Sequence, residues 1–285
     1  MTEIFRAVVR ISDVLCRVYM RVCALISPNT VSPTVFGARM NCNSRDFVQR
    51  RIRHFGIFEH NLTSFTRREL RPGDVYLDIG ANVGYFTLLA SRQVGPKGRV
   101  ISVEADPWTF RRLVDNVELN DCPNVRALNV AATGEPCKVR IERKDAGNSG
   151  TNSIAADQAE GNIEGWTFET IAGDDLSNIS FIKIDIEGSE APILKAILDL
   201  SGRLSNQLIV ASEVSEASAA FVAKFIAAGF DAYLMTNIYT IDYYLMRDYS
   251  KKFSEFETVH LERIEGYVPH HNDYVFVRGG RAFAR

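Results

Sequence analysis

The sequence predicts a doubly wound α/β fold, with a seven-stranded and mostly parallel sheet and an N-terminal helical extension. From Val75 onward, short apolar runs alternate with segments of helical periodicity, which is typical of a parallel sheet covered by helices on both faces. The first apolar run leads into a glycine-containing turn at residues 78–84, and the second ends in Glu104. A strand, a glycine turn and a helix in this order indicate Rossmann-like architecture.

Residues 1–26 are predicted to form an amphipathic helix with a basic stripe. Arg6, Arg10, Arg17 and Arg21 fall within an arc of about 60° at about 100° per residue, and apolar residues cover much of the other side. The charges interrupt the segment too often for a membrane span. Such a helix either lies on an anionic membrane surface or packs on its own domain or on a second copy, as in a homodimer. We favour packing.

A stretch rich in Ser, Thr, Pro and Asn at residues 28–33 is expected to end this helix. An arginine-rich lead-in follows, and a Pro-Gly-Asp turn stands just before the first sheet strand. We therefore divide the chain into an N-terminal helical extension and lead-in at residues 1–55 and a main domain at residues 56–285.

The main domain alternates predicted strands and helices. Residues 137–143 and 166–171 are also expected to be extended, on either side of a long polar loop at residues 145–165. The seven sheet strands are expected near residues 75–79, 99–104, 125–131, 181–186, 207–213, 230–235 and 273–278. The helices are expected near residues 84–94, 107–120, 190–200 and 217–228.

The turn after the first strand has the composition of a cofactor-binding turn. Gly80 allows a sharp turn at the strand end, and Gly84 allows the following helix to pack close to the strand. Asn82 stands where dinucleotide-binding turns carry their middle glycine, so the pattern suits a cofactor without a pyrophosphate, such as S-adenosylmethionine. Glu104 follows Gly84 at about the 20-residue spacing expected of a carboxylate that binds a ribose hydroxyl pair.

A third apolar run, residues 181–190, ends in Asp-Ile-Glu-Gly-Ser-Glu. Together with Asp-Ile-Gly-Ala-Asn-Val-Gly at residues 78–84, it resembles the FkbM-type methyltransferases. The resemblance covers roughly residues 50–280. It implies a class I S-adenosylmethionine-dependent methyltransferase, with an antiparallel last strand, that acts on a hydroxyl of a sugar, glycolipid or polyketide-like metabolite. Further matches are Phe-Gly-Ile-Phe-Glu at residues 55–59 and the spacing of Leu113, Asn116 and Asn120.

The resemblance also implies a role for each residue of the cofactor site. Asp78 is expected to hold the amino group of S-adenosylmethionine, directly or through water, and Glu104 its ribose. Ala132, after the third strand, is expected beside the adenine, and Glu59 is expected to close the cofactor pocket. The residues expected to shape the backbone beneath the cofactor are Gly80, Ala81, Asn82 and Gly84.

Methyl transfer is an in-line displacement, in which the acceptor oxygen must lie roughly 3 Å from the methyl carbon. A sugar hydroxyl is a poor nucleophile, so a general base is expected. Asp185 and Glu187 stand two residues apart and would share one face of a regular strand, and Glu213 ends the next strand. Any of the three is a candidate base, although Asp185 also suits a position facing the methionine part of the cofactor. Asp185 and Glu187 would suit Mg²⁺, but we predict no metal.

The composition is that of a globular enzyme. Of the 285 residues 46% are hydrophobic and 24% are charged, and the formal net charge is −2, so no basic field attracts nucleic acid. The five cysteines show no spacing typical of a zinc site or a disulfide framework. We expect a cytoplasmic protein with reduced thiols, peripheral at the membrane if its N-terminal helix binds there.

Three other functions use the same fold class. A nicotinamide-dependent oxidoreductase would prefer glycine at the position of Asn82. A nucleic-acid methyltransferase that modifies amino groups would carry Pro-Pro-aromatic after the fourth strand, where the chain reads Asp185-Ile-Glu-Gly. A non-catalytic partner subunit is disfavoured because the cofactor motifs are intact. We therefore expect a small-molecule, glycan or glycolipid acceptor.

Overall fold

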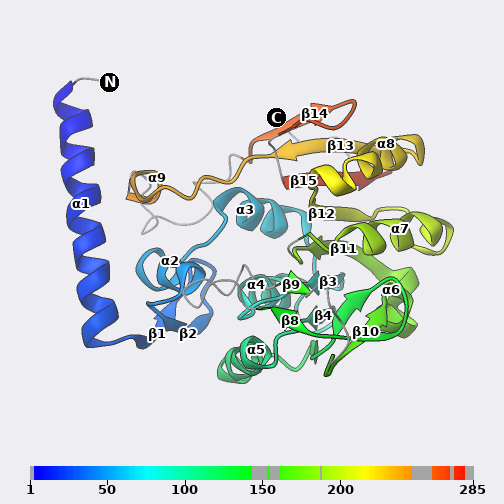
Figure 1. The fold of residues 1–285 in the computed structure, drawn as a ribbon, viewed down its shortest axis with the longest axis horizontal. Coiled ribbons are helices and arrows are strands. Elements are labelled where there is room, and N and C mark those ends of the chain that lie inside the picture. The colour runs from blue at the N-terminus through cyan, green and yellow to red at the C-terminus, as the bar shows by residue number, and fades with distance from the viewer. Residues whose placement is uncertain are drawn as a thin grey trace.

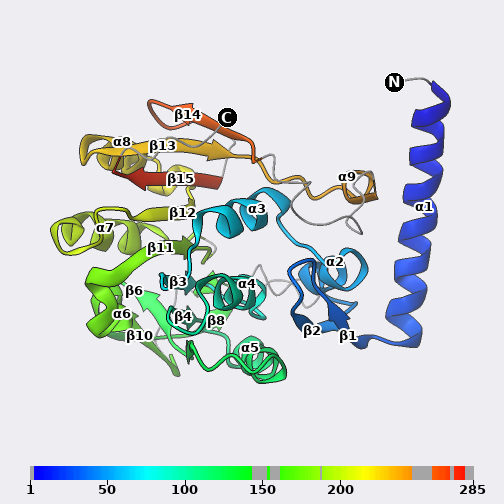
Figure 2. The same cartoon turned by 180° about the vertical axis from the view of Figure 1, so that it is seen from behind.

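The computed structural model describes residues 3–142, 153–154, 161–186, 188–245, 259–269 and 273–279. Its centre is a sheet in which eight described strands follow the order β14-β13-β15-β12-β11-β3-β4-β5 (Figure 1). Helices cover both faces of this sheet, as the view from behind also shows (Figure 2). In chain order the strands are β3 (Val75–Ile79), β4 (Arg99–Val103), β5 (Val125–Leu128), β11 (Ile179–Ile184), β12 (Ile209–Glu213), β13 (Phe230–Met235), β14 (Leu261–Ile264) and β15 (Asp273–Arg278).

All seven predicted strands are present, and the expected strand directions are confirmed. β5, β4, β3, β11 and β12 run parallel to one another, whereas β15 is antiparallel to both β12 and β13. β14 adds an eighth strand at the edge, antiparallel to β13. The sequence did not predict β14, because Leu261 and Ile264 are only half-buried and the two residues between them are charged and exposed.

The order of the strands reverses at β3. β4 and β5 extend the sheet on one side, and the chain then returns to add β11 on the other side. Such a reversal leaves a crevice at the carboxyl ends of the two central strands, where open α/β sheets bind their ligands. The glycine-containing turn follows β3 and Asp185 follows β11, so both lie at this crevice.

Alternate residues of the sheet face two hydrophobic cores. Leu77 and Ile79 of β3 belong to a core that includes residues of α6, α7 and α8. Tyr76, which directly precedes Leu77, belongs to a second core formed with α2, α3 and α4, because successive residues of a strand point to opposite faces of the sheet. The helices that cover the sheet are α3 (His60–Glu69), α4 (Tyr85–Val94), α5 (Pro107–Leu119), α6 (Phe168–Ala172), α7 (Ala191–Asp199) and α8 (Ala220–Ala227), with the 3₁₀ turns η2 (Gly173–Asn178), η3 (Ser201–Arg203) and η4 (Glu216–Ser218).

The lead-in forms a hairpin, β1 (Asn29–Pro33) with β2 (Arg39–Asn43), and a short helix, α2 (Phe47–Phe55). Asn116 of α5 ties β2 to the turn after β3. Its side chain accepts a hydrogen bond from the Asn41 N–H and donates one to the Val83 carbonyl, both at 2.8 Å. The predicted boundary between residues 55 and 56 therefore lies within one continuous packing unit, and the division into two domains stays a prediction.

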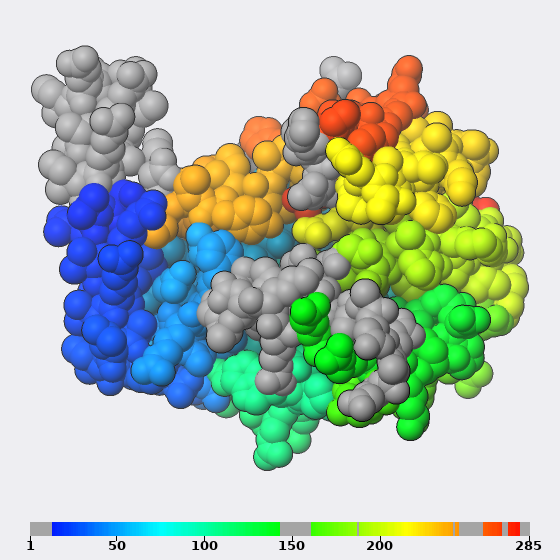
Figure 3. Space-filling model, in the orientation of Figure 1, coloured from blue at the N-terminus to red at the C-terminus, as the bar shows by residue number. Residues whose placement is uncertain are grey.

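The predicted N-terminal helix is present as α1 (Glu3–Ile26) and forms one flank of the molecule (Figure 3). It contacts the short helix α9 (Ile241–Leu245). None of the described helices is long and apolar enough to cross a membrane. Several large apolar side chains of α1 are exposed, namely Val14, Leu15, Val18, Tyr19, Val22, Leu25 and Ile26.

The segment after β5 differs from the sequence prediction. The strand expected to residue 131 ends at Leu128, and β6 (Ala131–Thr133) pairs with β10 (Ile163–Thr167) in a separate sheet whose third strand is β7 (Cys137–Val139). The extended segment expected at 166–171 is wrong beyond Thr167, because the hydroxyl of Thr167 caps helix α6 by accepting the Thr170 N–H. β8 (Ile141–Glu142) pairs with β9 (Ser153–Ile154). The rest of the predicted loop up to residue 160 lies outside the described residues.

Candidate active site

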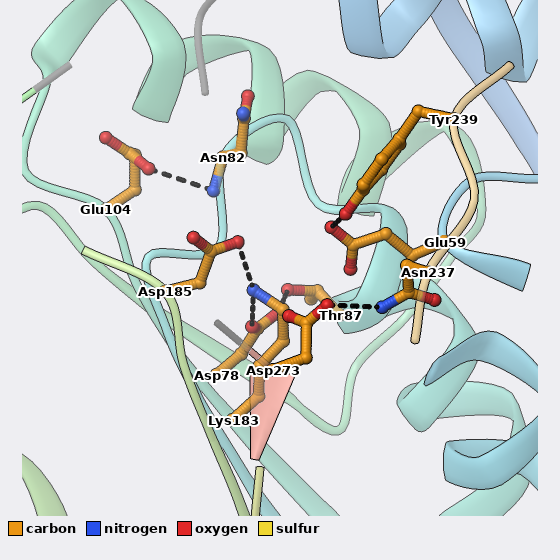
Figure 4. A network of polar contacts seen from close by, with 10 residues as sticks. All are labelled: Glu59, Asp78, Asn82, Thr87, Glu104, Lys183, Asp185, Asn237, Tyr239 and Asp273. Carbon is orange, nitrogen blue, oxygen red and sulfur yellow. Dashed lines mark hydrogen bonds and ion pairs between the residues drawn. The ribbon is translucent and has the colours of Figure 1, made fainter. Parts of the chain in front are cut away.

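A cavity of about 280 Å³ lies at the crevice between β3 and β11. It is bounded by the glycine-containing turn, by the carboxyl ends of β11 and β12, and by the start of α3. The polar side chains around it come from segments far apart in the chain (Figure 4). The lining residues include Phe47, Phe58, Glu59, Gly80, Ala81, Asn82, Tyr85, Phe86, Lys183, Asp185, Glu213 and Tyr239.

Gly80 has no space for a side chain. Its φ of 81° lies in the left-handed region, and a Cβ on it would lie 1.8 Å from the backbone oxygen of Asp185. The Asp185 N–H in turn donates to the Ile79 carbonyl at 2.9 Å. The ends of β3 and β11 therefore touch through backbone atoms, which only glycine permits.

Glu104 anchors the cofactor turn from the end of β4. One carboxylate oxygen accepts the Asn82 N–H and the other accepts the Asp106 N–H, both at 2.9 Å. The first of these bonds helps to hold Asn82 at its positive φ of 49°. Burial raises the pKa of Glu104 to about 7. Each oxygen keeps a second lone pair, so the carboxylate has the acceptors that a ribose hydroxyl pair needs.

Asp78 lies behind the cavity rather than on its lining, and its side chain is completely buried. Thr87 donates a hydrogen bond to Oδ2 at 2.7 Å, whereas Oδ1 has no hydrogen-bond partner among the described residues. Burial raises the pKa of Asp78. A buried carboxylate oxygen without a hydrogen-bond partner is energetically costly. Oδ1 is therefore well suited to accept a hydrogen bond from a ligand or from a water molecule.

Lys183 is the buried cation among these carboxylates, and the sequence analysis missed it. Its Nζ lies 2.9 Å from Asp185 Oδ2 and 4.0 Å from Asp78 Oδ1 (Figure 4). Burial alone would lower the pKa of Lys183, but the carboxylates of Asp185, Asp78 and Glu59 raise it above its ordinary value. A lysine is almost never fully buried unless it is paired with an acid. The position of Lys183 within a mostly apolar strand could therefore have indicated a buried ion pair.

Glu59 lies on the opposite side of the cavity, in a strained backbone conformation with φ 43° and ψ 71°. The Tyr239 hydroxyl donates a hydrogen bond to its carboxylate at 2.9 Å. Burial, and then the negative charges of Asp185 and Asp273, raise the pKa of Glu59 to about 8. A non-glycine residue in this region costs roughly 1–3 kcal/mol and is typical of functional sites.

This raised pKa predicts a pH-dependent stability. Between the ordinary pKa of 4.5 and about 8, folded Glu59 keeps a proton that the unfolded chain releases. Stability therefore falls as pH rises through this window. We expect Glu59→Gln, which is neutral at every pH, to lose less stability than the wild type between pH 5 and 9, by a difference on the order of a few kcal/mol. Thermal unfolding across this range measures the effect, and parallel pH profiles of the two proteins would contradict it.

Asp273 and Glu213 complete the acidic cluster. The strand register places Asp273, the first residue of β15, opposite Glu213, the last residue of β12. Asn237 donates a hydrogen bond to Asp273 at 3.1 Å. Burial is the main reason that the pKa of Asp273 is raised to about 6, and Asp185 adds to the shift. Asp273, Asn237 and Tyr239 were not predicted, since their neighbours in the sequence give no motif.

The structure brings most of the predicted site residues together. Glu59, Gly80, Ala81, Asn82, Asp185 and Glu213 line the cavity. Asp78 is buried behind the cavity, where Thr87 donates to it, and Glu104 holds the turn by accepting the Asn82 N–H. A Cβ on Gly84 would contact Leu113 at 3.4 Å. Ala132 is buried in the core around α6 and α7, away from the cavity lining, so its contact with adenine stays a prediction. Glu187 lies outside the described residues.

Sequence similarity to known proteins shows which family the chain belongs to. The sequence model of the family described as Methyltransferase FkbM domain matches residues 78–232, more than half of the chain. The chain belongs to this family. It is therefore a methyltransferase whose cofactor is S-adenosylmethionine, and the nicotinamide alternative is set aside.

Other similarities are weaker. A segment of 56 residues, 20% of this chain, is 39% identical to an arsenite methyltransferase of Halobacterium salinarum, of which it covers only 14%. The solved methyltransferase structures named below have TM-scores under 0.5, so the family assignment rests on the sequence match. One is precorrin-6y C5,15-methyltransferase of Geobacter metallireducens, with 14% identity over 76% of this chain and 88% of that chain and a TM-score of 0.41. Another is a SAM-dependent O-methyltransferase of Thermotoga maritima, with 12% identity over 80% of this chain and 68% of that chain and a TM-score of 0.42. A third is fibrillarin of Aeropyrum pernix with bound S-adenosyl-L-methionine, with 10% identity over 76% of this chain and 73% of that chain and a TM-score of 0.42.

The site of this FkbM methyltransferase suits its cofactor. S-adenosylmethionine carries a positively charged sulfonium, and the polar network around Lys183 contains four acidic side chains, namely Glu59, Asp78, Asp185 and Asp273. Glu59 keeps its proton at neutral pH, but the three aspartates still outnumber the lysine. This excess of acid favours a cation. No group of three or more His, Cys, Asp or Glu side chains that could hold a metal occurs within the described part of the chain.

Proposed function

We propose that this FkbM methyltransferase transfers the methyl group of S-adenosylmethionine to a hydroxyl oxygen of a sugar, glycolipid or polyketide-like metabolite. The observation that carries the proposal is the pair of acidic side chains Asp185 and Glu213 on the cavity lining. A neutral hydroxyl must lose a proton as its oxygen attacks the methyl carbon, and a carboxylate placed in the cavity is able to accept that proton.

Asp185 is the first candidate for this base. Its side chain is 32% exposed, whereas the side chain of the paired Lys183 is only 4% exposed. The carboxylate therefore faces the cavity, and the ammonium group lies on its buried side. The contact with Lys183 holds Asp185 in one orientation (Figure 4). Glu213, on the neighbouring strand, is the second candidate, and Glu187 remains a third from the sequence alone.

The cofactor supplies an activated methyl group, so the protein mainly positions the two reactants and excludes water. Glu104 would hold the ribose, and Asp78 the amino group directly or through water. The aromatic side chains of Phe58, Tyr85 and Phe86 on the lining would keep water from the methyl group.

The base assignment predicts a selective loss of turnover. We expect Asp185→Asn to lower kcat by about 10²–10⁴-fold, because asparagine keeps the shape but accepts no proton. The affinity for S-adenosylhomocysteine should change by less than about threefold, since the reaction product needs no base. Transfer of a labelled methyl group to a panel of hydroxyl acceptors measures kcat, and calorimetry measures affinity.

Glu213→Gln is the matched control on the adjacent strand. If it loses turnover while Asp185→Asn does not, Glu213 is the base. If Asp185→Asn instead loses S-adenosylhomocysteine binding, Asp185 belongs to the cofactor site. Wild-type protein that binds the cofactor but methylates amines rather than hydroxyls would overturn the proposed O-methylation.

A further inference from the structure

A second, larger cavity lies between α1, α2 and the start of α9, beside the cofactor cavity. Its volume is about 810 Å³. We call it the arginine groove, because the described residues that line it include five arginines and no aspartate or glutamate. Figure 3 shows α1 and α9 side by side at this flank. The five arginines are Arg17, Arg21, Arg45, Arg50 and Arg51.

The positive charge of this groove is not neutralised by the described part of the chain. Arg17 pairs with Asp13 at 2.9 Å. The other ion pairs that the structure describes involve neither the remaining arginines of the groove nor any residue of α2. Four guanidinium groups that share one cavity repel one another, so an anion bound among them would be strongly favoured.

Arg51 provides an independent indication of a ligand. Its side chain is only 8% exposed, and its Nε has no hydrogen-bond partner among the described residues. The guanidinium lies over the Phe47 ring, 3.6 Å from its centroid, and one Nη donates to the Tyr239 carbonyl at 2.7 Å. A buried guanidinium without a counter-charge is unfavourable, and the planar fork of arginine matches the oxygens of a phosphate.

The arginine groove and the cofactor cavity share a wall. Phe47 and Tyr239 line both. The backbone oxygen of Tyr239 accepts from Arg51 on the groove side, while its hydroxyl donates to Glu59 in the cofactor cavity. A molecule whose anionic group occupied the groove would therefore extend past these two rings toward the carboxylates proposed to act on its hydroxyl.

We propose that the arginine groove binds a phosphate group of the methyl acceptor, so that the acceptor class is a phosphate-linked sugar or glycolipid. The inference rests on the proposed function, because it names the substrate of the same site. The groove also has apolar lining residues, Met20, Leu25 and Phe55, beside the exposed apolar side chains of α1. Phosphate next to an apolar surface is the chemistry of a lipid phosphate, although a soluble phosphate ester would use the same arginines.

The test is a titration of the full-length protein with inorganic pyrophosphate at low ionic strength. We expect binding by the wild type and an affinity at least about tenfold lower in Arg50→Gln and in Arg51→Gln. Arg50 is half-exposed, so its variant keeps the test valid if Arg51→Gln does not fold. Arg111→Gln, at an exposed arginine of α5 outside the groove, removes the same charge and should bind like the wild type.

Vesicles distinguish the two sources of phosphate. Flotation with phosphatidylglycerol vesicles but not phosphatidylcholine vesicles, lost in Arg50→Gln, would support a lipid-linked acceptor. Pyrophosphate binding without flotation would support a soluble phosphate ester. Absence of both, or binding that the groove substitutions leave unchanged, would overturn the inference.

The same samples separate this inference from the proposed function. If phosphate binding is absent while the protein methylates a neutral hydroxyl acceptor, only the inference fails. If phosphate binds as expected but no hydroxyl acceptor, with or without a phosphate, is methylated, the proposed O-methylation fails instead. Titration with S-adenosylhomocysteine should give the wild-type affinity in Arg50→Gln and Arg111→Gln, which shows that these two variants are folded.

Discussion

Gly80→Ala should abolish cofactor binding and destabilise the protein severely. The new Cβ would lie 1.8 Å from the Asp185 backbone oxygen, a distance that real Cβ atoms do not reach, and the obstacle is backbone that cannot rotate away. Relief would require the ends of β3 and β11 to separate, which would break the Asp185 N–H bond to Ile79. We expect a loss of more than about 4 kcal/mol, seen as a lower midpoint of thermal unfolding and no S-adenosylhomocysteine binding.

Gly73→Ala is the matched control. Gly73 also has a positive φ, 95°, but no atom lies within 4 Å of the position of its Cβ. It should therefore show only the strain of a left-handed alanine, about 1–2 kcal/mol, and bind the cofactor normally. Equal destabilisation by the two substitutions would show that the close approach to Asp185 does not matter.

Glu104→Ala should remove cofactor binding while the sheet stays folded. The carboxylate accepts two backbone N–H groups, from Asn82 and Asp106, that hold the turn, and it is the predicted partner of the ribose hydroxyls. Hydrogen bonds to a charged group contribute roughly 1.5–3 kcal/mol each. We therefore expect the affinity for S-adenosylhomocysteine to fall by at least about 100-fold, measured by calorimetric titration.

Two further titrations interpret that result. Glu104→Gln keeps one acceptor oxygen and should lose less affinity than Glu104→Ala. NAD should not bind the wild type, because Asn82 replaces the glycine that a pyrophosphate would approach. An unchanged affinity in Glu104→Ala would place the ribose elsewhere.

The cofactor turn could be predicted from sequence because its information is local. Gly80, Gly84 and Glu104 act through backbone conformation and through spacing along two consecutive strands, and both are visible in the order of residues. The seven predicted strands were found for the same reason, since the alternation of apolar runs and helical segments directly reports burial. The edge strand β14 was missed because its extended conformation depends on pairing with β13. The start of α6 was missed because the capping hydroxyl of Thr167 sets it.

The acidic cluster and the arginine groove could not be predicted in this way. Asp273 comes beside Glu213 only through the register of β15 on β12. Tyr239 bonds to Glu59, 180 residues away in the sequence, and Arg51 bonds to the same tyrosine. No short motif encodes contacts between residues so far apart in the chain.

By itself, the sequence determined the α/β fold class, the cofactor turn and the methyltransferase family of this protein. Only the tertiary structure decided which ionisable groups face the cavity and which are buried behind it. The physical reason is that strand order and helix ends depend on local patterns, whereas the charge state of Lys183, Glu59 or Asp78 depends on the burial and the neighbours that folding assembles from distant segments.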